Sequence, residues 1–332
     1  MSQKNVAVTV VIPTYNRAEI VTKAIDSVLA QTYQDYEIIV VDDGSTDNTG
    51  KLLTKRYGKR IRYIYQPNAG VSAARNKGVD ASGSDLVAFL DSDDFWLPRK
   101  LEVQLPLMSD PDVVLSYTNW SFDTNPDKDH FSAIGLSFEH DGNIFSEPIA
   151  LYARLRAIGA TTSAVICRKS VLSRIGGFDE RLKVFEDVRA WFRLAMEGKF
   201  AATSETLLVR CGSDTVERLS RSSYSFFKEA TDAQLETFLE CYARAIDSAP
   251  DVQKGLRKEV ACYLTRQSQY LALDGNYGMA RRKAFESLVF GPRGKSALRA
   301  IVGLILPRAF HFLGNCKKKS ALSEEAESPP GE

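Results

Sequence analysis

Three carboxylates follow an apolar run near residue 90, and their spacing is typical of a cation or ligand site. Residues 86–90 read LVAFL, and Asp91, Asp93 and Asp94 come directly after them. Such a run predicts a buried strand, and carboxylates two residues apart at its end should point the same way. Converging carboxylates repel unless a cation lies between them, and Mg²⁺ or Mn²⁺ suits oxygen ligands of this kind. The alternative is a polar turn with a helix cap, where Asp and Ser are common.

A second pair of acids, Glu186 and Asp187, stands before a segment that carries Trp191 and Phe192. The spacing of its apolar residues predicts an amphipathic helix that begins at these acids. Carboxylates at a helix N-terminus are stabilised by the helix dipole. Taken alone, the pair therefore has a purely structural explanation.

The elements that would position these acids alternate between strands and helices over the first 110 residues. Strands are predicted at residues 6–12, 37–41 and 61–65, with helices at 20–31, 48–57 and 71–79. This alternation predicts an α/β fold with an open, mostly parallel sheet and flanking helices. Ligands of such sheets bind outside the carboxyl ends of the strands. Three further polar clusters fall at those ends, namely Pro13–Arg17, Asp42–Asp47 and Asn68–Gly70.

The clusters favour a nucleotide as the ligand. An acid after the second strand can accept hydrogen bonds from a ribose or a base. The first turn, however, lacks G-x-G-x-x-G, and no Walker motif is present, so two common phosphate-binding loops are excluded. The sequence thus predicts a nucleotide site whose phosphates are neutralised mainly by a metal.

Composition narrows the class of protein. The chain has 332 residues, 44% of them hydrophobic, and a net charge of +1, so bulk charge does not favour nucleic acid as a partner. Its five cysteines are scattered and without C-x-x-C spacing, which indicates reduced thiols in a cytoplasmic protein. We find no signal sequence and no apolar stretch of membrane-spanning length.

As a set, four motifs resemble those of inverting family-2 glycosyltransferases with the GT-A fold, in a non-processive bacterial form. They are VVIPTYNR, the run from SVLAQTY to EIIVVDDGSTDNT, NAGVSAARNKG and LVAFLDSDDFWLPRKL. The resemblance is close over about residues 5–105 and looser to about 215. It implies a nucleotide-sugar donor, most often UDP-linked, and a divalent metal, Mn²⁺ or Mg²⁺.

The resemblance also assigns roles to individual residues. The metal would be held by Asp93 with Asp91. Asp187 would be the base that takes the acceptor's proton, with Glu186 in support. The nucleotide pocket would comprise Pro13, Thr14, Tyr15, Arg17, Asp42, Asp43, Asn68, Arg75, Asp91 and Ser92. Asp94 would lie behind the metal ligands or cap the next helix, predicted at residues 97–108.

The second half of the expected catalytic domain carries fewer signals. A hairpin or flap is predicted at 121–145, with His130 and His140 as solvated loop residues, then a helix at 146–158 and a strand at 159–168. The family often has a histidine after the helix that begins at Glu186. Here Arg210, Arg218 or Arg221 would replace it, and the sequence does not choose among them. Since Q-x-x-R-W is absent, we expect a single sugar to be added per encounter.

The expected organisation is a catalytic domain at 1–222, a helical region at 223–316 and a disordered tail at 317–332. The nucleotide half of the catalytic domain would be about 1–110, and the acceptor half about 111–222. Helices are predicted at 224–247, 252–274, 277–290 and 295–313. The basic, apolar segment Lys295–Lys319 would either lie on anionic lipid at the inner face of the cell membrane or pack on the catalytic domain.

The sequence therefore predicts a glycosyltransferase that acts on a glycan or lipid-linked glycan acceptor, in cell-surface polysaccharide or glycolipid assembly. The alternatives are a nucleotidyltransferase of the same fold, which should carry an early Gly-rich basic loop, and a non-catalytic module that binds nucleotide-sugars. Binding of the nucleotide-sugar without transfer or hydrolysis would favour the latter.

Overall fold

A computed structural model describes residues 6–136, 143–146, 148, 161–212, 231–232, 235–240, 242–243, 250–291 and 300. The chain divides into two compact units, Met1–Arg221 and Ser222–Glu332.

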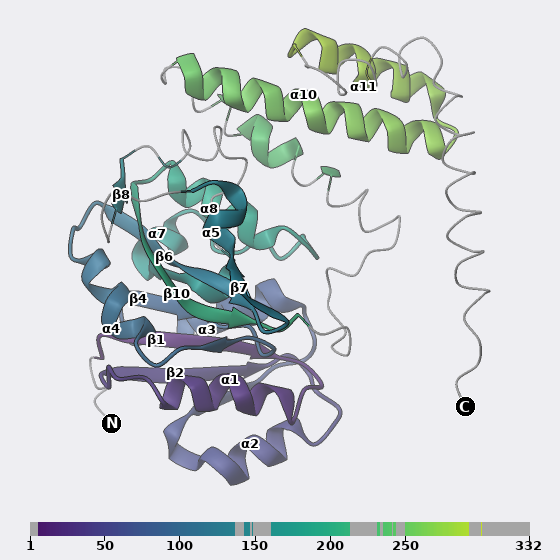
Figure 1. Ribbon diagram of the computed structural model, residues 1–332. Helices are drawn as coiled ribbons and strands as arrows, with labels where there is room; N and C mark the ends of the chain where they lie inside the picture. Colours follow the sequence, from purple (N-terminus) through teal and green to yellow (C-terminus); the bar gives the residue numbers. More distant parts are fainter. Residues whose placement is uncertain are drawn as a thin grey trace. The chain divides into compact units, whose positions relative to one another are not determined.

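The first unit is built on one mixed sheet whose strand order is β3-β2-β1-β4-β9-β6-β10-β5, with β7 beside β6 and β8 beside β10 (Figure 1). Its strands are β1 (Val8–Thr14), β2 (Tyr36–Asp42), β3 (Arg62–Tyr65), β4 (Leu86–Phe89), β5 (Phe95–Trp96), β6 (Val113–Phe122), β7 (Asn125–Asp129), β8 (Asn143–Phe145), β9 (Val165–Arg168) and β10 (Lys199–Arg210). The first four strands of that order are parallel, as are β6 and β10. The predicted α/β architecture is confirmed.

Strand β9 runs antiparallel to both of its neighbours, β4 and β6, and so joins the two parallel parts of the sheet. Its N-terminal end therefore lies beside the carboxyl end of β4 and the middle of β6. The short 3₁₀ helix η3 (Thr162–Ala164) directly precedes β9. This places η3 at the edge of the sheet where ligands bind in parallel folds.

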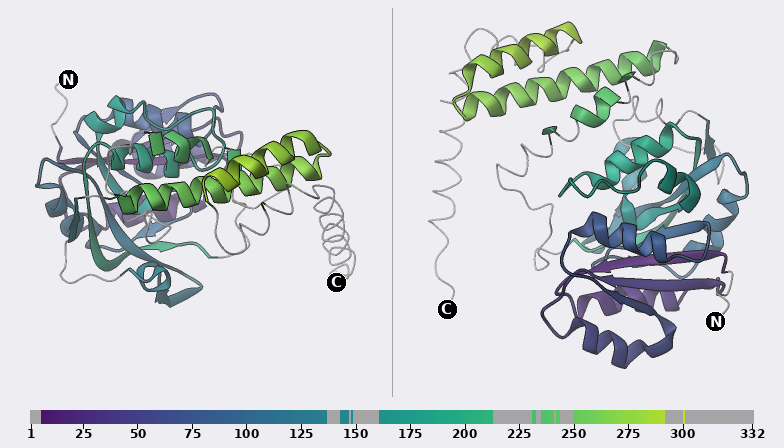
Figure 2. Two further views of the ribbon diagram at one scale, coloured as in Figure 1. Left: turned by 90° about the horizontal axis from the view of Figure 1, so that it is seen from above. Right: turned by 180° about the vertical axis from the view of Figure 1, so that it is seen from behind.

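Helices cover both faces of the sheet. In the two parallel crossovers that lead toward β3, the chain passes through α1 (Ile20–Leu29) and α2 (Thr49–Tyr57), and α2 is followed by η1 (Gly58–Arg60). The next crossover reverses direction, so α3 (Val71–Ala81) covers the opposite face (Figures 1 and 2). A Cβ on Gly78 of α3 would lie 2.3 Å from Val11, so this helix can approach β1 only without a side chain there.

The remaining elements of this unit are short apart from one helix. They are α4 (Lys100–Gln104), η2 (Leu105–Met108), α5 (His130–Ile134), α7 (Lys169–Arg174) and α8 (Glu186–Ala195). The helix predicted at 97–108 begins only at Lys100 and tightens into η2. Helix α8 begins at Glu186, as predicted, and packs Trp191 against Phe89 and Phe178.

Strand β10 was not predicted. Its polar middle, Thr203–Glu205, interrupts the apolar pattern, and the register with β6 shifts at the same point. Of the hairpin or flap predicted at 121–145, the part up to Asp129 is a hairpin, in which β7 pairs antiparallel with the end of β6. The predicted helix at 146–158 lies almost wholly outside the described residues.

The second unit contains α10 (Pro250–Leu273) and α11 (Tyr277–Val289), close to two of the predicted helices. Buried hydroxyls join them, since Thr265 and Ser287 lie 2.7 Å apart. The other predicted helices, the segment Lys295–Lys319 and the tail fall wholly or largely outside the described residues. Among the described helices, none is both long and apolar enough to cross a membrane.

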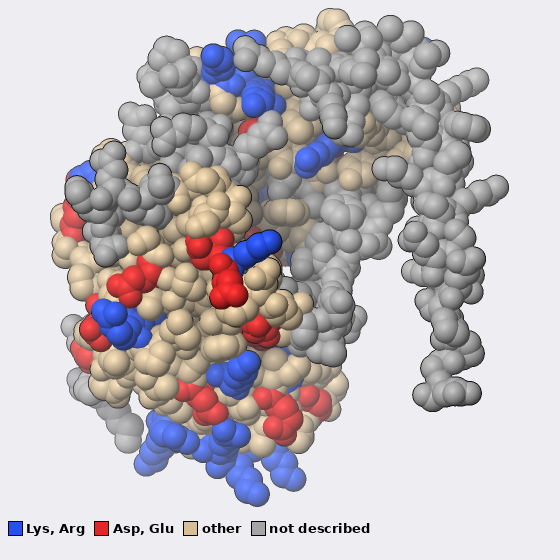
Figure 3. All heavy atoms as spheres, in the orientation of Figure 1, with Lys and Arg blue, Asp and Glu red and all other residues tan. Residues whose placement is uncertain are grey.

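Basic side chains gather on the first unit over α2 and η1 (Figure 3). They are Lys51, Lys55, Arg56, Lys59 and Arg60, and all five are exposed. The helices that carry this surface lie in the crossover that leads to β3, the edge strand of the sheet.

Candidate active site

The polar clusters predicted at the strand ends are brought together at one edge of the sheet. Asn16, after β1, has a positive φ of 50° and joins the first two clusters. Its backbone N–H donates to Ser45 Oγ (2.8 Å), and its Oδ1 accepts from the backbone N–H of Thr46 (2.7 Å). A left-handed conformation is tolerated by Asn better than by most residues. These hydrogen bonds therefore hold the loops after β1 and β2 together.

The two acids at the end of β2, Asp42 and Asp43, are both buried and both hold the protein's own loops in place. Asp42 accepts hydrogen bonds from Tyr63 Oη (2.6 Å) and from the backbone of Ser45 (2.8 Å). Asp43 accepts from Gln66 Nε2 (2.7 Å) and from the backbone of Ala69 and Gly70 (2.9 and 2.8 Å). Asp43 thus fixes the Asn68–Gly70 loop against β2. A contact of either acid with a base stays a prediction.

The end of β1 offers a second set of groups to a ligand. Pro13 and Thr14 are buried, whereas the Tyr15 side chain is 47% exposed. Within the described part of the chain, the buried hydroxyl of Thr14 has no hydrogen-bond partner. A buried hydroxyl without a partner is costly unless a ligand or water satisfies it.

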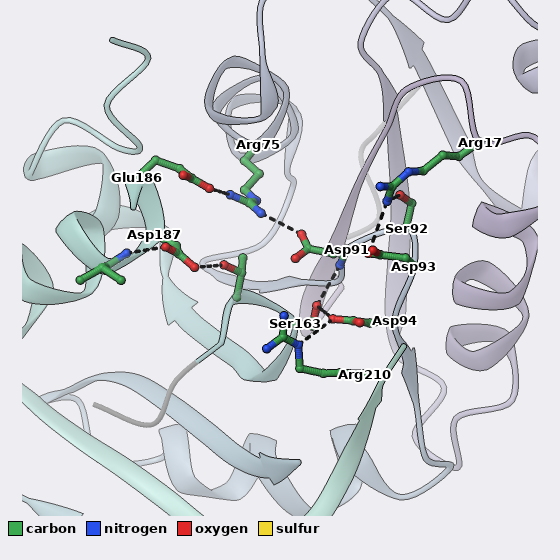
Figure 4. Close-up of polar contacts among 12 residues, drawn as sticks. Arg17, Arg75, Asp91, Ser92, Asp93, Asp94, Ser163, Glu186, Asp187 and Arg210 are labelled. Carbon is green, nitrogen blue, oxygen red and sulfur yellow. Dashed lines mark hydrogen bonds and ion pairs between the residues drawn. The ribbon is translucent and has the colours of Figure 1, made fainter. Parts of the chain in front are cut away.

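Residues 90–94, which we call the acidic turn, differ from the predicted strand end. β4 ends at Phe89, and the backbone N–H of Asp94 donates to the Asp91 carbonyl (3.1 Å), so the acids lie in a turn. Arg17 donates to Ser92 Oγ (3.0 Å) and pairs with Asp93 (3.4 Å), whereas Asp91 pairs with Arg75 (Figure 4). The prediction that Asp91 and Asp93 lie at the end of a strand was therefore wrong, whereas their binding of one cation stays a prediction.

The acidic turn offers carboxylate oxygens to a cation. Within the described residues, no group of three His, Cys, Asp or Glu side chains could bind a metal. Mg²⁺ and similar ions are commonly bound through one or two carboxylates plus substrate phosphates and water. Asp93, with Asp91 two residues away, supplies carboxylate oxygens suited to that mode. The residues present fit a metal that is shared with a phosphate.

Arg75 links the acidic turn to the start of α8 (Figure 4). Its guanidinium donates to Asp91 Oδ1 (2.8 Å) and to Glu186 Oε1 (2.6 Å), and the arginine is almost fully buried. Although burial opposes ionisation of Asp91, the adjacent Arg75 keeps the pKa of this carboxyl below its usual range. Burial raises the pKa of Glu186 to about 7, and the neighbouring Asp187 adds to that effect, while Arg75 opposes it.

Asp187 differs from Glu186 in exposure and partners. It is half-buried, whereas Glu186 is buried. Its Oδ2 accepts from Thr162 Oγ1 (2.8 Å) and its Oδ1 from the backbone of Val188 (2.7 Å). The residue before the pair, Phe185, has φ = 61°, and such strain in a non-glycine residue is concentrated at functional sites.

Sequence reasoning named Asp94 and Arg210 but missed Ser163, which joins them in one cluster at the acidic turn. Asp94 accepts from Ser163 Oγ (2.7 Å) and pairs with Arg210 (3.7 Å), and burial raises the pKa of Asp94 to about 7. Of the three arginines proposed for the segment after α8, only Arg210 is among the described residues. Ser163 gave no signal, because its partners come from a distant segment that only the sheet order brings near.

His130 was predicted to be a solvated loop residue, and this was wrong. It begins α5, is half-buried, and its ring stacks on Trp120 with the ring centroids 4.4 Å apart. Burial lowers the pKa of His130, and the positive charge of Arg210 acts in the same direction. Arg210 also lies over the Trp120 ring, 4.8 Å from its centroid. His140 lies outside the described residues.

Comparison with known proteins agrees with this architecture. The model of Glycosyl transferase family 2 matches residues 9–176, which include every strand of the first parallel part and the acidic turn. The chain belongs to this family and has the GT-A fold. An uncharacterised glycosyltransferase of Rickettsia felis is 32% identical over 225 residues. That alignment covers 66% of this chain but only 35% of the rickettsial protein.

Solved structures share the fold. The crystal structure of S. aureus TarS 1-349 in complex with UDP-GlcNAc superposes with a TM-score of 0.63 at 15% identity, covering 93% of this chain and 92% of that one. A mannosyltransferase of Pyrobaculum calidifontis, in complex with GDP-Man and Mn²⁺, gives a TM-score of 0.52 at 17% identity, covering 93% and 84%. At these identities the likeness carries the fold alone.

Proposed function

We propose that this glycosyltransferase moves one sugar from a nucleotide-sugar, most simply a UDP-sugar, to an acceptor hydroxyl with inversion at the anomeric carbon. The observation that carries this proposal is the Arg75 bridge. It ties the acidic turn, where a sugar-nucleotide would bind, to the acid pair that begins α8.

The nucleotide would lie along the carboxyl ends of β1 and β2. Tyr15 is exposed there, next to the buried residues Pro13 and Thr14. Asp42, Asp43 and Asn68 would border the base. Arg17 and Ser92 would face the diphosphate, while Asp91, held by Arg75, would face the ribose and sugar. The bound nucleotide-sugars of the two solved relatives support such a ligand.

A divalent metal, Mn²⁺ or Mg²⁺, would be held by Asp93 with Asp91 and the diphosphate. It would supply Lewis-acid stabilisation of the negative charge that develops on the leaving nucleotide. The Mn²⁺ in the mannosyltransferase complex supports this assignment. Arg17, which lies 3.4 Å from Asp93, would contribute positive charge to the same phosphates.

Asp187 would accept the proton of the attacking hydroxyl, and Glu186 would act through Arg75. Asp187 is the more exposed of the two, and hydrogen bonds from Thr162 and Val188 fix both of its oxygens. Glu186 is buried against Arg75 and has no comparable access to solvent. A carboxylate serves as general base because the hydroxyl loses its proton as it attacks. Attack opposite to the leaving group inverts the anomeric carbon.

The acceptor would be a glycan or a lipid-linked glycan, in cell-surface polysaccharide or glycolipid assembly, with one sugar added per encounter. This rests on analogy with the family. We further propose a cytoplasmic location, peripheral at the inner face of the cell membrane through Lys295–Lys319.

Calorimetric titration with UDP, GDP and dTDP, each with and without Mn²⁺, tests the sugar-nucleotide half of the proposal. We expect one nucleotide to bind, and to bind much more tightly with Mn²⁺. If none of them binds under any condition, the acidic turn is a structural turn and the proposal is wrong. If one binds but its sugar conjugates are neither transferred nor hydrolysed, the chain is a binding module.

A further inference from the structure

Two adjacent hydroxyls in η3 contact opposite sides of the candidate active site. Thr162 Oγ1 donates to Asp187 Oδ2 (2.8 Å). Ser163 Oγ donates to Asp94 Oδ2 (2.7 Å) and accepts from the backbone N–H of Asp91 (3.1 Å) (Figure 4). Both residues are buried, with side chains at most 1% exposed. One turn of chain therefore holds both the acidic turn and Asp187.

The position of this turn is fixed from several directions. The Ser163 carbonyl accepts from Trp96 Nε1 (2.8 Å), and the Ala164 carbonyl accepts from Gln104 Nε2 (3.0 Å). β9, which follows directly, is paired on both sides, with β4 and with β6. A turn held in this way cannot follow a movement of α8 or of the acidic turn without breaking buried hydrogen bonds, which is costly.

We infer that Thr162 and Ser163 are positioning residues, which set the place of Asp187 relative to the acidic turn. The inference rests on the proposed function, because it takes Asp187 to be the base and the acidic turn to hold the sugar-nucleotide. Thr162 orients the carboxylate of Asp187 toward the acceptor hydroxyl. Ser163 holds the backbone of the acidic turn in the conformation that binds the diphosphate and its metal.

The two hydroxyls should then have separable effects. Loss of the Thr162 hydroxyl leaves the acidic turn intact, so kcat falls while nucleotide affinity does not change. Loss of the Ser163 hydroxyl removes the support of Asp91 and Asp94, so nucleotide affinity falls. A role in stability alone would produce neither of these selective changes, because both variants would then lose the same properties together.

The test compares Thr162→Val, Thr162→Ser and Ser163→Ala. Thr118→Val is the matched control, because the buried Thr118 hydroxyl in β6 has no hydrogen-bond partner within the described part of the chain. Binding of UDP with Mn²⁺ is measured by calorimetry. Hydrolysis of UDP-GlcNAc to UDP and free sugar, in which water takes the place of the acceptor hydroxyl, gives kcat, and urea unfolding verifies that each variant folds. If UDP-GlcNAc is not turned over, GDP replaces UDP and GDP-Man replaces UDP-GlcNAc.

We expect Thr162→Val to lower kcat about tenfold to a hundredfold, as for a lost hydrogen bond to a charged group, with an unchanged Kd. Thr162→Ser should restore kcat, and Thr118→Val should resemble the wild type. Ser163→Ala should weaken nucleotide binding about tenfold. The inference is overturned if Thr162→Val keeps full kcat, if it weakens binding as much as Ser163→Ala does, or if Thr162→Ser does not rescue. Absence of both binding and turnover in the wild type would overturn the proposed function and, with it, this inference.

Discussion

The guanidinium of Arg75 lies 2.6 Å from Glu186, although the two residues are 111 positions apart in the chain. The same guanidinium reaches Asp91 at 2.8 Å. One buried cation therefore neutralises two carboxylates that belong to different halves of the first unit. The Arg75 guanidinium also lies over the Phe178 ring, 5.4 Å from the ring centroid.

Replacement of Arg75 should be strongly destabilising, because it leaves two acids near each other without their cation. We expect Arg75→Met to lower the free energy of unfolding by about 3–5 kcal/mol in urea titrations. Arg75→Lys keeps the charge but cannot bridge both acids in the same way. Its free energy of unfolding should therefore lie between those of the wild type and Arg75→Met. The exposed pair Arg56–Asp26 provides the control, since Arg56→Met should cost less than about 1 kcal/mol. Equal losses in Arg75→Met and Arg56→Met would contradict this account.

The raised pKa of Glu186 predicts a specific pH dependence of stability. Because its pKa is about 7 in the folded protein and near 4.5 when unfolded, the folded state binds more protons between these values. The contribution of Glu186 to the free energy of unfolding should therefore fall as pH rises from 4.5 to 7. Glu186→Gln should lose that dependence, with a change on the order of 3 kcal/mol relative to wild type across this window. Urea titrations at pH 5 and pH 8 measure it, and Glu102→Gln, an exposed acid, should keep the wild-type slope.

Lys100 predicts the opposite dependence. Its side chain is fully buried against Trp96 and Gln104, and burial lowers its pKa well below the ordinary 10.5. Below pH 10.5 the unfolded chain therefore binds the additional proton, so this group makes stability rise with pH from its folded pKa to 10.5. Lys100→Met should remove that rise, whereas Lys55→Met on exposed α2 should not. Equal pH slopes in wild type and Lys100→Met would show that Lys100 stays protonated in the fold.

Asp93 should account for the metal dependence of nucleotide binding. Asp93→Asn keeps the shape of the side chain and removes its charge, so the gain in UDP affinity on addition of Mn²⁺ should shrink about tenfold or more. Affinity without metal should change little. Asp35→Asn, at an exposed position before β2, is the control. If Asp93→Asn keeps the full response to Mn²⁺, the metal is not held there.

Most strands and helices of the nucleotide half could be predicted, because β1, β2 and β4 are apolar runs that end in polar residues and the helices lie between them. The contacts that assemble the site could not be predicted from the sequence. Ser163 meets Asp94 only because β9 inserts antiparallel between β4 and β6, and no local pattern specifies that order. The conformation of the acidic turn was also beyond local reasoning, because Arg17 and Arg75, which pair with its carboxylates, come from other segments of the chain. β10 was not predicted because polar residues in its middle interrupt the apolar pattern, and its pairing with β6 cannot be read from the local sequence.

The most direct test of the central claim compares wild type with Asp187→Asn. The substitution removes the carboxylate that would take the acceptor's proton but leaves the acidic turn and its arginines intact. We predict that release of nucleoside diphosphate from the sugar-nucleotide falls by about a hundredfold to ten-thousandfold, while nucleotide affinity with Mn²⁺ stays at the wild-type value. Wild-type turnover in Asp187→Asn would contradict the account.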